Sequence, residues 1–368
     1  MKICSPQLGM DPNSTLGGEV HDHFVLQNLA RLGEKIYVYL PKKRDYQKHR
    51  NLTVQYAPIK HIPAFLFNII EIPYLFKIYK KEKFQILRVH SPYFVGLGSL
   101  FFKLFNKQVP VVATYHLIEN GFVFNLINRL TAQKYDAIFT VSKFVKNWLV
   151  KNYGVEADKV QVVYNGVNPS LKPQAKSLSL LKKFNLQDKF VILFMGVLIE
   201  RKNPMFLLEI YKQLKSKHRE VALIICGKGH LKSKLEKFTK ENNLSDVIFA
   251  NEAYGEEKLE LFNLCDVFAL PSKNEGFGLV VAEAMACRKA VIVADNSSLR
   301  EIVKAGEDGI LAKTDNTNDW TQKLEELLTN KRLREKLGAN AYRKAKNLFN
   351  WGNAVHAHQK LFEKLTNA

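Results

Sequence analysis

The amino-acid sequence predicts an α/β protein made of two doubly wound domains. Three observations lead to this prediction. Short apolar runs rich in β-branched residues alternate with helical patterns along the whole chain. These runs are apolar on both faces, which is typical of strands buried in parallel sheets. The chain has 368 residues, more than the roughly 250–300 at which a single hydrophobic core stops growing, so we expect two domains.

The expected strands form two series. The first series comprises residues 1–4, 35–39, 86–89, 111–114, 137–141 and 161–164. The second comprises residues 190–194, 221–226, 247–249, 267–270, 290–294 and 309–312. Helical patterns lie between the strands, for example at residues 20–32, 144–153, 205–217 and 279–288. Each series therefore predicts one parallel sheet covered by helices.

A turn-rich segment separates the two series. Asn165-Gly166 is followed by Pro169 and Pro173, and these residues are typical of turns and linkers. We therefore place the boundary near Pro169, with domains at residues 1–169 and 170–349. Open α/β sheets bind ligands at the carboxyl ends of their strands, and two such domains facing each other would form an interdomain cleft. Functional residues are thus expected directly after strands.

The loop at residues 271–278 carries the strongest functional signal. It holds Glu275, Gly276 and Gly278, and the helix that follows from Leu279 carries Glu283. Glycines allow the backbone to approach a ligand, and free amides at a helix N-terminus suit an anion such as a diphosphate. Each carboxylate has a simpler interpretation, as a solvated loop residue or as a favourable charge in the first helical turn.

Composition limits the partners and the compartment. The formal net charge of +20 attracts polyanions, although a solvated basic surface explains it as well. Lysines at 77, 80, 81 and 83 close an apolar, aromatic segment, and a further basic run is Lys42-Lys43-Arg44. An anionic membrane surface is therefore a candidate partner. Nucleic acid is not expected, because no nucleic-acid-binding motif is present.

Neither a signal peptide nor a membrane-spanning segment is expected from the apolar patterning. The four cysteines are far apart, which favours a reducing, cytoplasmic setting. His21 and His23 do not share a helical face, so we expect no metal site from them.

Glu275, seven intervening residues and then Glu283 resemble the E-x7-E element of retaining glycosyltransferases of the GT-B type. The resemblance is to the large family 4 / group 1, which includes phosphatidylinositol mannosyltransferases and sucrose synthases. It extends over nearly the whole chain in the family's order. The matching elements are Gly17-Gly18 after the first strand, His116 at the end of PVVATYH, Val141-Ser142, Asn165-Gly166-Val167, Lys202, Gly227-Lys228-Gly229, Asn296-Ser297-Ser298 and the Trp351 helix.

The resemblance implies a hexose transfer from a nucleotide-diphosphate sugar, with no further cofactor and no metal, to a lipid-linked or carbohydrate acceptor. It also implies a helix at residues 350–368 that crosses back to the N-terminal domain. The cysteine usage and the basic charge lead us to expect a location in the cytoplasm or at the inner face of the cell membrane. The implied catalytic residues are His116, Lys202 and Glu275. The implied donor-binding residues are Gly17, Gly18, Arg201, Lys202, Gly227, Glu275, Gly276, Phe277, Gly278, Leu279 and Glu283.

One position departs from the family's pattern. Val197 stands where the family usually has an arginine that binds the donor diphosphate. A regulatory or inactive nucleotide-sugar-binding relative is therefore the main alternative. A glycoside hydrolase is less favoured, because Glu275 and Glu283 are expected on the same side of one ligand rather than flanking a scissile bond. A dehydrogenase would need G-x-G-x-x-G after the first strand, which residues 6–18 do not supply.

Overall fold

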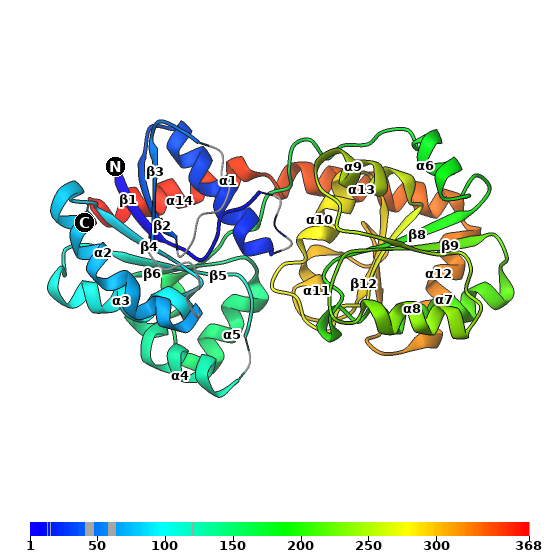
Figure 1. Cartoon of the computed structure of the whole chain (residues 1–368), viewed down its shortest axis with the longest axis horizontal. Coiled ribbons are helices and arrows are strands. Elements are labelled where there is room, and N and C mark those ends of the chain that lie inside the picture. The colour runs from blue at the N-terminus through cyan, green and yellow to red at the C-terminus, as the bar shows by residue number, and fades with distance from the viewer. Residues whose placement is uncertain (13, 15, 41–47, 58–63, 120, 368) are drawn as a thin grey trace. The chain divides into compact units, whose positions relative to one another are not determined.

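The computed structural model describes residues 1–12, 14, 16–40, 48–57, 64–119 and 121–367. The chain folds as two compact units (Figure 1). The first unit comprises Met1–Gly166 and Trp351–Ala368, and the second comprises Val167–Asn350. Each unit has one parallel sheet with helices on both faces, which confirms the predicted α/β class. The basic run Lys42-Lys43-Arg44 lies outside the described residues.

The first unit has a seven-stranded sheet in which all neighbouring strands are parallel. Its strand order is β3 (Leu52–Tyr56), β2 (Lys35–Leu40), β1 (Lys2–Pro6), β4 (Ile86–His90), β5 (Val111–Tyr115), β6 (Ala137–Thr140) and β7 (Val160–Val162). The direction of winding reverses between β1 and β4, so the loops after these two strands diverge. Such a reversal is where doubly wound sheets bind ligands.

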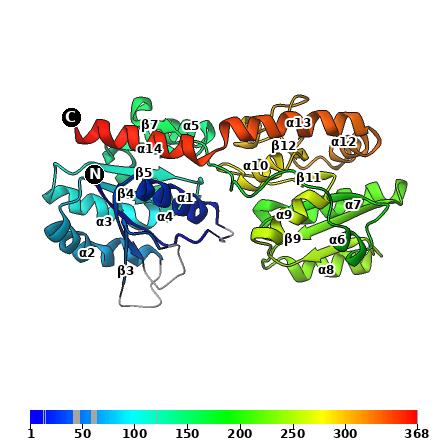
Figure 2. The same ribbon diagram turned by 90° about the horizontal axis from the view of Figure 1, so that it is seen from above.

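Two hydrophobic cores cover the two faces of this sheet. Neighbouring residues of β1 point to opposite cores, Ile3 to one and Cys4 to the other. The first core is covered by α1 (Gly17–Arg31) and α14 (Trp351–Thr366). The second is covered by α2 (Phe67–Glu82), α3 (Pro92–Phe105), α4 (Phe122–Thr131), η2 (Ala132–Lys134) and α5 (Lys143–Tyr153), and the short helix η1 (Ala64–Leu66) directly precedes α2. Figure 2 shows α14 on the side of the sheet opposite to α2 and α3.

The C-terminal helix is fixed to the first unit by Trp351. A Cβ atom on Gly166 would lie 2.4 Å from the Trp351 nitrogen, so glycine is needed for this approach. The Trp351 ring stacks on Phe24 of α1 with 4.9 Å between the ring centroids. The Asn165-Gly166 segment is therefore a packing site for α14 as well as the end of the first part of this unit.

The second unit has a six-stranded parallel sheet. Its strand order is β10 (Val247–Ala250), β9 (Val221–Cys226), β8 (Phe190–Met195), β11 (Val267–Leu270), β12 (Ala290–Ala294) and β13 (Ile310–Ala312). The helices are α6 (Leu178–Lys183), η4 (Glu200–Lys202), α7 (Pro204–Lys217), α8 (Lys232–Glu241), α9 (Gly255–Leu264), α10 (Leu279–Ala286), α11 (Leu299–Ile302), α12 (Thr317–Thr329) and α13 (Lys331–Leu348). Here the winding reverses between β8 and β11.

Every strand expected from the sequence is present, with ends within two residues. The prediction missed β3, Leu52–Tyr56. This strand alternates buried and exposed residues because it lies at the edge of the sheet, and its polar positions interrupt the apolar run that marked the other strands.

The α2–α3 contact depends on Gly98. A Cβ atom there would lie 2.2 Å from the carbonyl oxygen of Asn68 and 2.4 Å from Oε1 of Glu71. Asn68 in turn donates to the carbonyl of Tyr93 over 3.0 Å and accepts from the amide of Leu97 over 3.0 Å. Burial raises the pKa of Glu71 well above its ordinary value, so this carboxyl is neutral within the helix pair.

We predict that Gly98→Ala destabilises the first unit by about 1–3 kcal/mol, because α2 and α3 must separate to admit the methyl group. Chemical unfolding monitored by circular dichroism measures this. Leu97→Ala, at an exposed position of the same helix, is the control and should change stability by less than about 0.5 kcal/mol. A Gly98→Ala variant as stable as the wild type would contradict the packing described here.

Candidate functional site

The two strands at the reversal of the second unit place three charged side chains together. Lys202 ends the short helix after β8, and Glu275 lies in the loop after β11. The Lys202 Nζ atom lies 2.5 Å from Oε1 of Glu275, and Arg201 Nη1 lies 3.3 Å from Oε2. Glu275 is 5% exposed and Lys202 9% exposed. One buried carboxylate is therefore held between two cations.

Burial and the neighbouring charges shift the pKa of Glu275 in opposite directions. Burial alone would raise the pKa of Glu275, but the charges of Lys202 and Arg201 outweigh it and hold the pKa below the ordinary value. Glu275 is consequently ionised at neutral pH. The three groups carry a net positive charge, which suits the binding of an anion.

Neighbouring turns fix the position of Glu275. The amide of Glu275 donates to Ser297 Oγ over 3.1 Å, and Ser298 Oγ donates to the Glu275 carbonyl over 2.9 Å. Ser272 Oγ donates to the carbonyl of Arg201 over 3.0 Å, which ties the loop after β11 to the loop after β8. Ser297 and Ser298, which belong to the Asn296-Ser297-Ser298 element of the family resemblance, therefore position the backbone of Glu275.

Gly227 lets the loops after β8 and β9 pack backbone against backbone. Its φ is +146°, and a Cβ atom there would lie 2.0 Å from the carbonyl oxygen of Gly196. The amide of Leu198 donates to the carbonyl of Lys228 over 2.8 Å in the same contact. No larger residue fits at Gly227, so its role is to keep these two loops joined beside Lys202.

The loop after β11 leads directly into α10. Gly278, with a φ of +89°, precedes Leu279, the first residue of that helix. The first amides of a helix have no intrahelical acceptor and carry a partial positive charge. Gly276 is buried in the same loop. The ring of Phe277 is turned toward Phe349, 5.4 Å away between centroids, so only its backbone remains for a ligand.

Glu283 lies within α10 and is 3% exposed. Its Oε1 atom lies 2.7 Å from Lys258 Nζ, while Oε2 is buried and accepts no hydrogen bond from any described residue. A buried carboxylate oxygen without a donor can accept from a ligand hydroxyl. Sequence reasoning missed Lys258, because a lysine in the charged helix α9 gives no local sign of its partner.

The reversal of the first unit brings together residues from three elements. His90 ends β4, His116 directly follows β5, and Gly18 lies at the start of α1. His116 Nε2 lies 3.1 Å from His90 Nδ1. A Cβ atom on Gly18 would lie 3.2 Å from His90 Cε1 and 3.5 Å from His116 Cδ2. The adjacent Gly17 has open space around it.

A buried ion pair supports these histidines. Asp22 and Arg88 are both fully buried and form an ion pair, and His90 Nδ1 lies 2.7 Å from the second oxygen of Asp22. Burial would raise the pKa of Asp22, but Arg88 and His90 outweigh it and hold the pKa well below its ordinary value. Sequence reasoning missed both residues. The one available signal was an arginine inside the apolar strand ILRVH.

Three nearby imidazoles, those of His21, His116 and His358, are neutral. Burial, with the nearby charge of Arg88, lowers the pKa of His21 to about 4. Burial also holds the pKa values of His116 and His358 well below the ordinary value. His21 Nδ1 lies 2.7 Å from Asn165 Oδ1, an acceptor, so the network assigns the ring proton to Nδ1.

His21, Asp22 and His116 offer ligand atoms within 4.8 Å of one another. One oxygen of Asp22 is already paired with the Arg88 guanidinium, and the other lies 2.7 Å from His90 Nδ1 without forming a hydrogen bond with any described residue. The fixed positive charge of Arg88, which is paired with Asp22, opposes a cation bound in this cluster. We therefore assign no metal to this cluster.

Comparison with known proteins identifies the family. The family described as "Glycosyltransferase Family 4" matches residues 16–171, and the family described as "Glycosyl transferases group 1" matches residues 179–344. The chain belongs to the group 1 / family 4 glycosyltransferases. This membership confirms the resemblance inferred from the E-x7-E element and supports a nucleotide sugar as the donor.

Two sequence relatives of this glycosyltransferase illustrate the range of similarity. The "Uncharacterized glycosyltransferase MJ1178" of Methanocaldococcus jannaschii is 29% identical over 352 residues, covering 93% of each chain. The N-acetylgalactosamine-N,N'-diacetylbacillosaminyl-diphospho-undecaprenol 4-alpha-N-acetylgalactosaminyltransferase of Campylobacter jejuni is 32% identical over 232 residues, covering 62% of this chain and 60% of that one.

A solved structure shows the fold. The glycosyltransferase is similar to sucrose-phosphate synthase from Thermosynechococcus elongatus with a TM-score of 0.87 and 18% identity, covering 100% of this chain and 99% of that one. The predicted GT-B fold, with two Rossmann-like domains, is thereby confirmed.

We predict that stability falls as the pH drops below about 6.5, because the unfolded histidines bind protons that the buried ones exclude. For His21, whose folded pKa is about 4, the loss extends from about pH 6.5 down to about pH 4. Each buried histidine should contribute up to about 1.4 kcal/mol per pH unit.

Unfolding by guanidinium at pH 8 and at pH 5 measures this dependence. His358→Gln should remove part of the pH dependence, since it removes one buried, neutral imidazole. His356→Gln changes an exposed histidine of the same helix and should leave the dependence unaltered. An equal effect of the two variants would argue against the assignment.

Proposed function

We propose that this glycosyltransferase is a retaining, metal-independent hexosyltransferase that takes its sugar from a nucleotide-diphosphate donor. The observation that carries the proposal is Glu275 held between Lys202 and Arg201 at the ends of β8 and β11. This arrangement combines a sugar-hydroxyl acceptor with two cations at the reversal of a doubly wound sheet.

The donor diphosphate would be bound by Lys202, Arg201 and the first amides of α10 after Gly278 and Leu279. Gly227 and Gly276 would allow close approach of the backbone. These donors stabilise the negative charge that develops on the leaving diphosphate, and such electrostatic stabilisation usually contributes most to catalysis of this kind. On donor binding, Lys202 would exchange part of its contact with Glu275 for a phosphate oxygen.

Arg201 provides a guanidinium near the position where Val197 replaces the family's usual arginine. Val197 supplies no guanidinium, but Arg201 Nη1 lies 2.9 Å from the carbonyl of Asn274 and 3.3 Å from Glu275, which places a second cation beside Lys202. The inactive-relative alternative rests on Val197 alone. The position of Arg201 favours the active enzyme.

Glu275 would accept hydrogen bonds from hydroxyls of the donor sugar. Glu283 would accept from the ribose through the Oε2 atom that no described residue satisfies, with Lys258 holding the other oxygen. His116 would orient the sugar as a neutral imidazole, with His90 and Asp22 holding its ring in place and Gly17 and Gly18 keeping the approach open.

The acceptor in this proposal is a lipid-linked or carbohydrate hydroxyl, and the location is the cytoplasm or the inner face of the cell membrane. The name of the Campylobacter relative includes a diphospho-undecaprenol carrier, which supports the lipid-linked class. Retention would follow from attack on the face of the sugar that the leaving diphosphate occupies, without a dedicated nucleophile.

We predict that one of UDP-, GDP- or ADP-glucose raises the thermal stability of the wild type, by about 2.7 kcal/mol at 100 times the dissociation constant. Lys202→Gln and Glu275→Gln should lower the transfer rate about 10²–10³-fold, as loss of one charge-stabilising group does. Lys273→Gln, at an exposed lysine of the same loop, is the control and should retain activity. A Lys202→Gln/Glu275→Gln variant with full activity would refute the site.

We also predict that an α-linked donor yields an α-linked product, and that EDTA leaves the rate unchanged. Proton NMR of the product identifies the anomeric configuration through the coupling constant of the anomeric proton. A β-linked product would contradict retention, and a rate restored only by added Mg²⁺ or Mn²⁺ would contradict metal independence.

A further inference from the structure

Exposed apolar side chains are concentrated on one layer of the first unit. Most of the large hydrophobic residues that are exposed among the described residues lie in η1, α2, α3 and α4. They are Phe65, Leu66, Ile69, Leu97, Phe101, Leu104, Phe105, Phe122, Val123, Leu126 and Leu130, which we call the apolar face. Contiguous exposed apolar surface on a folded protein marks an interaction site.

The apolar face is a second hydrophobic side on helices whose first side is already buried. In α3, Val95 and Phe102 are fully buried in the core, whereas Leu97, Phe101 and Leu104 point outward at helical spacing. In α4, Phe122 is 83% exposed, and Leu126 and Leu130 follow it at intervals of four. A surface helix that only covers a core has no need for these outward side chains.

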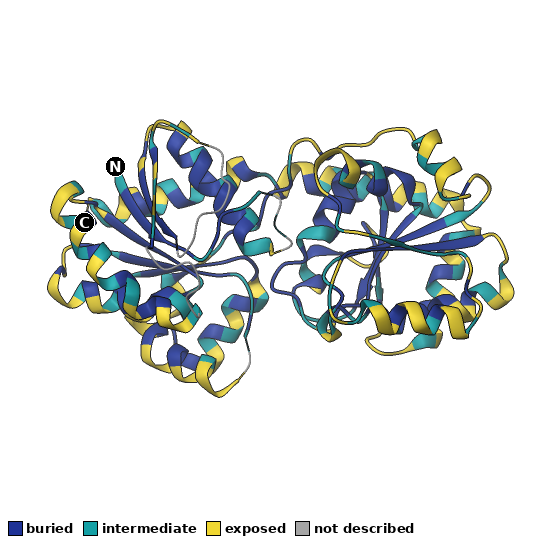
Figure 3. Cartoon of the chain, viewed as in Figure 1, coloured by how far each residue is buried: buried dark blue, intermediate teal, exposed yellow. Residues whose placement is uncertain are grey.

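Ring contacts join η1, α3 and α4 into one surface. Phe65 of η1 lies 5.1 Å from Phe94 of α3 and 5.4 Å from Phe124 of α4, between ring centroids. Helices α2, α3 and α4 cover the same side of the sheet, so their outward sides form its outer surface. Figure 3 shows exposed residues along the outer sides of these helices.

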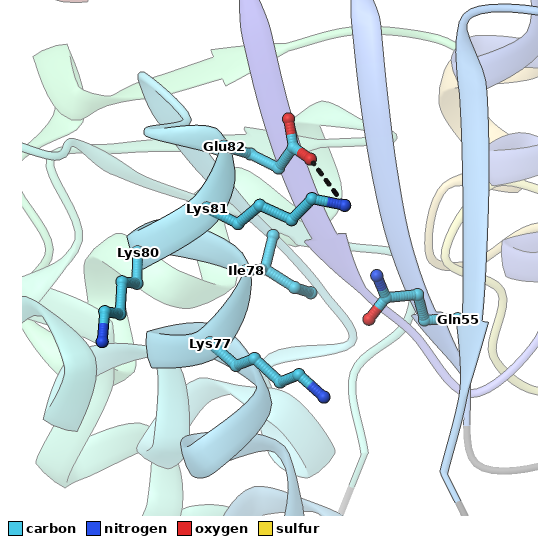
Figure 4. Close-up of a pocket in the computed structure, with 6 residues that line it drawn as sticks. All are labelled: Gln55, Lys77, Ile78, Lys80, Lys81 and Glu82. Carbon is cyan, nitrogen blue, oxygen red and sulfur yellow. Dashed lines mark ion pairs between the residues drawn. The ribbon is translucent and has the colours of Figure 1, made fainter.

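Basic residues border this face along α2. The exposed side of α2 runs from Leu66 and Ile69 through Pro73 to Lys77 and Lys80. Lys77, Lys80 and Lys81 line an open pocket together with Gln55, Ile78 and Glu82 (Figure 4). Lys81 lies 3.7 Å from Glu82, but neither Lys77 nor Lys80 forms an ion pair with any described residue.

The charge balance decides which partner fits. Between residues 64 and 135 the chain has three carboxylates, Glu71, Glu82 and Glu119, against eight lysines and arginines besides the buried Arg88. Glu71 is fully buried and Glu82 contacts Lys2 and Lys81. A second copy of this chain would bring two basic borders together. An anionic bilayer instead offers acyl chains to the apolar face and phosphates to the lysines.

None of the described helices is long and apolar enough to cross a membrane.

We infer that the apolar face docks on the surface of an anionic lipid bilayer, with Phe101, Leu104, Phe105 and Phe122 entering the interface and the α2 lysines contacting lipid phosphates. The inference rests on the proposed function in one respect only: docking on the bilayer would bring the enzyme to a lipid-linked acceptor.

The test is flotation of the full chain with two kinds of vesicle, one of phosphatidylcholine alone and one of equal parts phosphatidylcholine and phosphatidylglycerol. Wild type should bind the mixed vesicles, and 1 M salt should weaken binding because it screens the lysines. Leu104→Ser/Phe105→Ser should reduce binding at least tenfold, and each of Lys77→Gln and Lys80→Gln about fivefold.

Matched controls come from the second unit. Leu178→Ser removes an equally exposed leucine, and Lys336→Gln/Lys346→Gln removes two exposed lysines from α13. Both controls should bind like wild type. Equal binding by the α2 and α3 variants and wild type, equal losses in the controls, or no binding of wild type would each overturn the inference. So would a wild-type dimer in light scattering that Leu104→Ser/Phe105→Ser dissociates.

Two further measurements separate this inference from the proposed function. Leu104→Ser/Phe105→Ser should retain the thermal shift with the nucleotide sugar, and Lys202→Gln should retain vesicle binding. Vesicle binding without any response to nucleotide sugars would refute the proposed function alone. A nucleotide-sugar response without vesicle binding would refute the docking surface alone.

Discussion

Parallel strands covered by helices on both faces have almost no place for polar side chains except at their ends. In this glycosyltransferase, Ile3 and Cys4 of one strand already face two different cores. Polar chemistry is therefore displaced to the loops that follow the strands, and the reversals of strand order hold these loops apart. Lys202 and Glu275 lie at one reversal, and His90 and His116 lie near the other.

Both reversals contain buried charge, and each compensates it differently. Removing one partner of a buried ion pair typically costs about 3–5 kcal/mol, so the charges at both reversals are kept close to partners. Asp22 pairs with Arg88, lies 2.7 Å from His90 Nδ1 and stays within the first unit beside the neutral imidazoles of His21 and His116. Glu275 has two cations around one carboxylate, which leaves positive charge available for a ligand. The first arrangement is structural and the second is suited to binding.

The helices α2 and α3 serve two surfaces at once. Their inner sides fill the core of the first unit, where Gly98 allows a close contact and the neutral Glu71 is enclosed. Their outer sides carry leucine, phenylalanine and lysine in place of the mixed charges that a solvated helix usually has. A core on one side and the proposed docking surface on the other explain why apolar residues occur on both sides of these helices.

The sequence by itself determined the α/β class and every strand but β3, because apolar periodicity is a local pattern. The E-x7-E spacing singled out Glu275 and Glu283, and the ordered resemblance to the family singled out Lys202 and His116. It could not supply the partners of these residues. Lys258 beside Glu283, Arg201 beside Glu275 and Asp22 between Arg88 and His90 are contacts between residues distant in the chain. Only the tertiary structure decided these contacts, because the pairing of buried charges depends on which strands become neighbours, and no local pattern encodes that order.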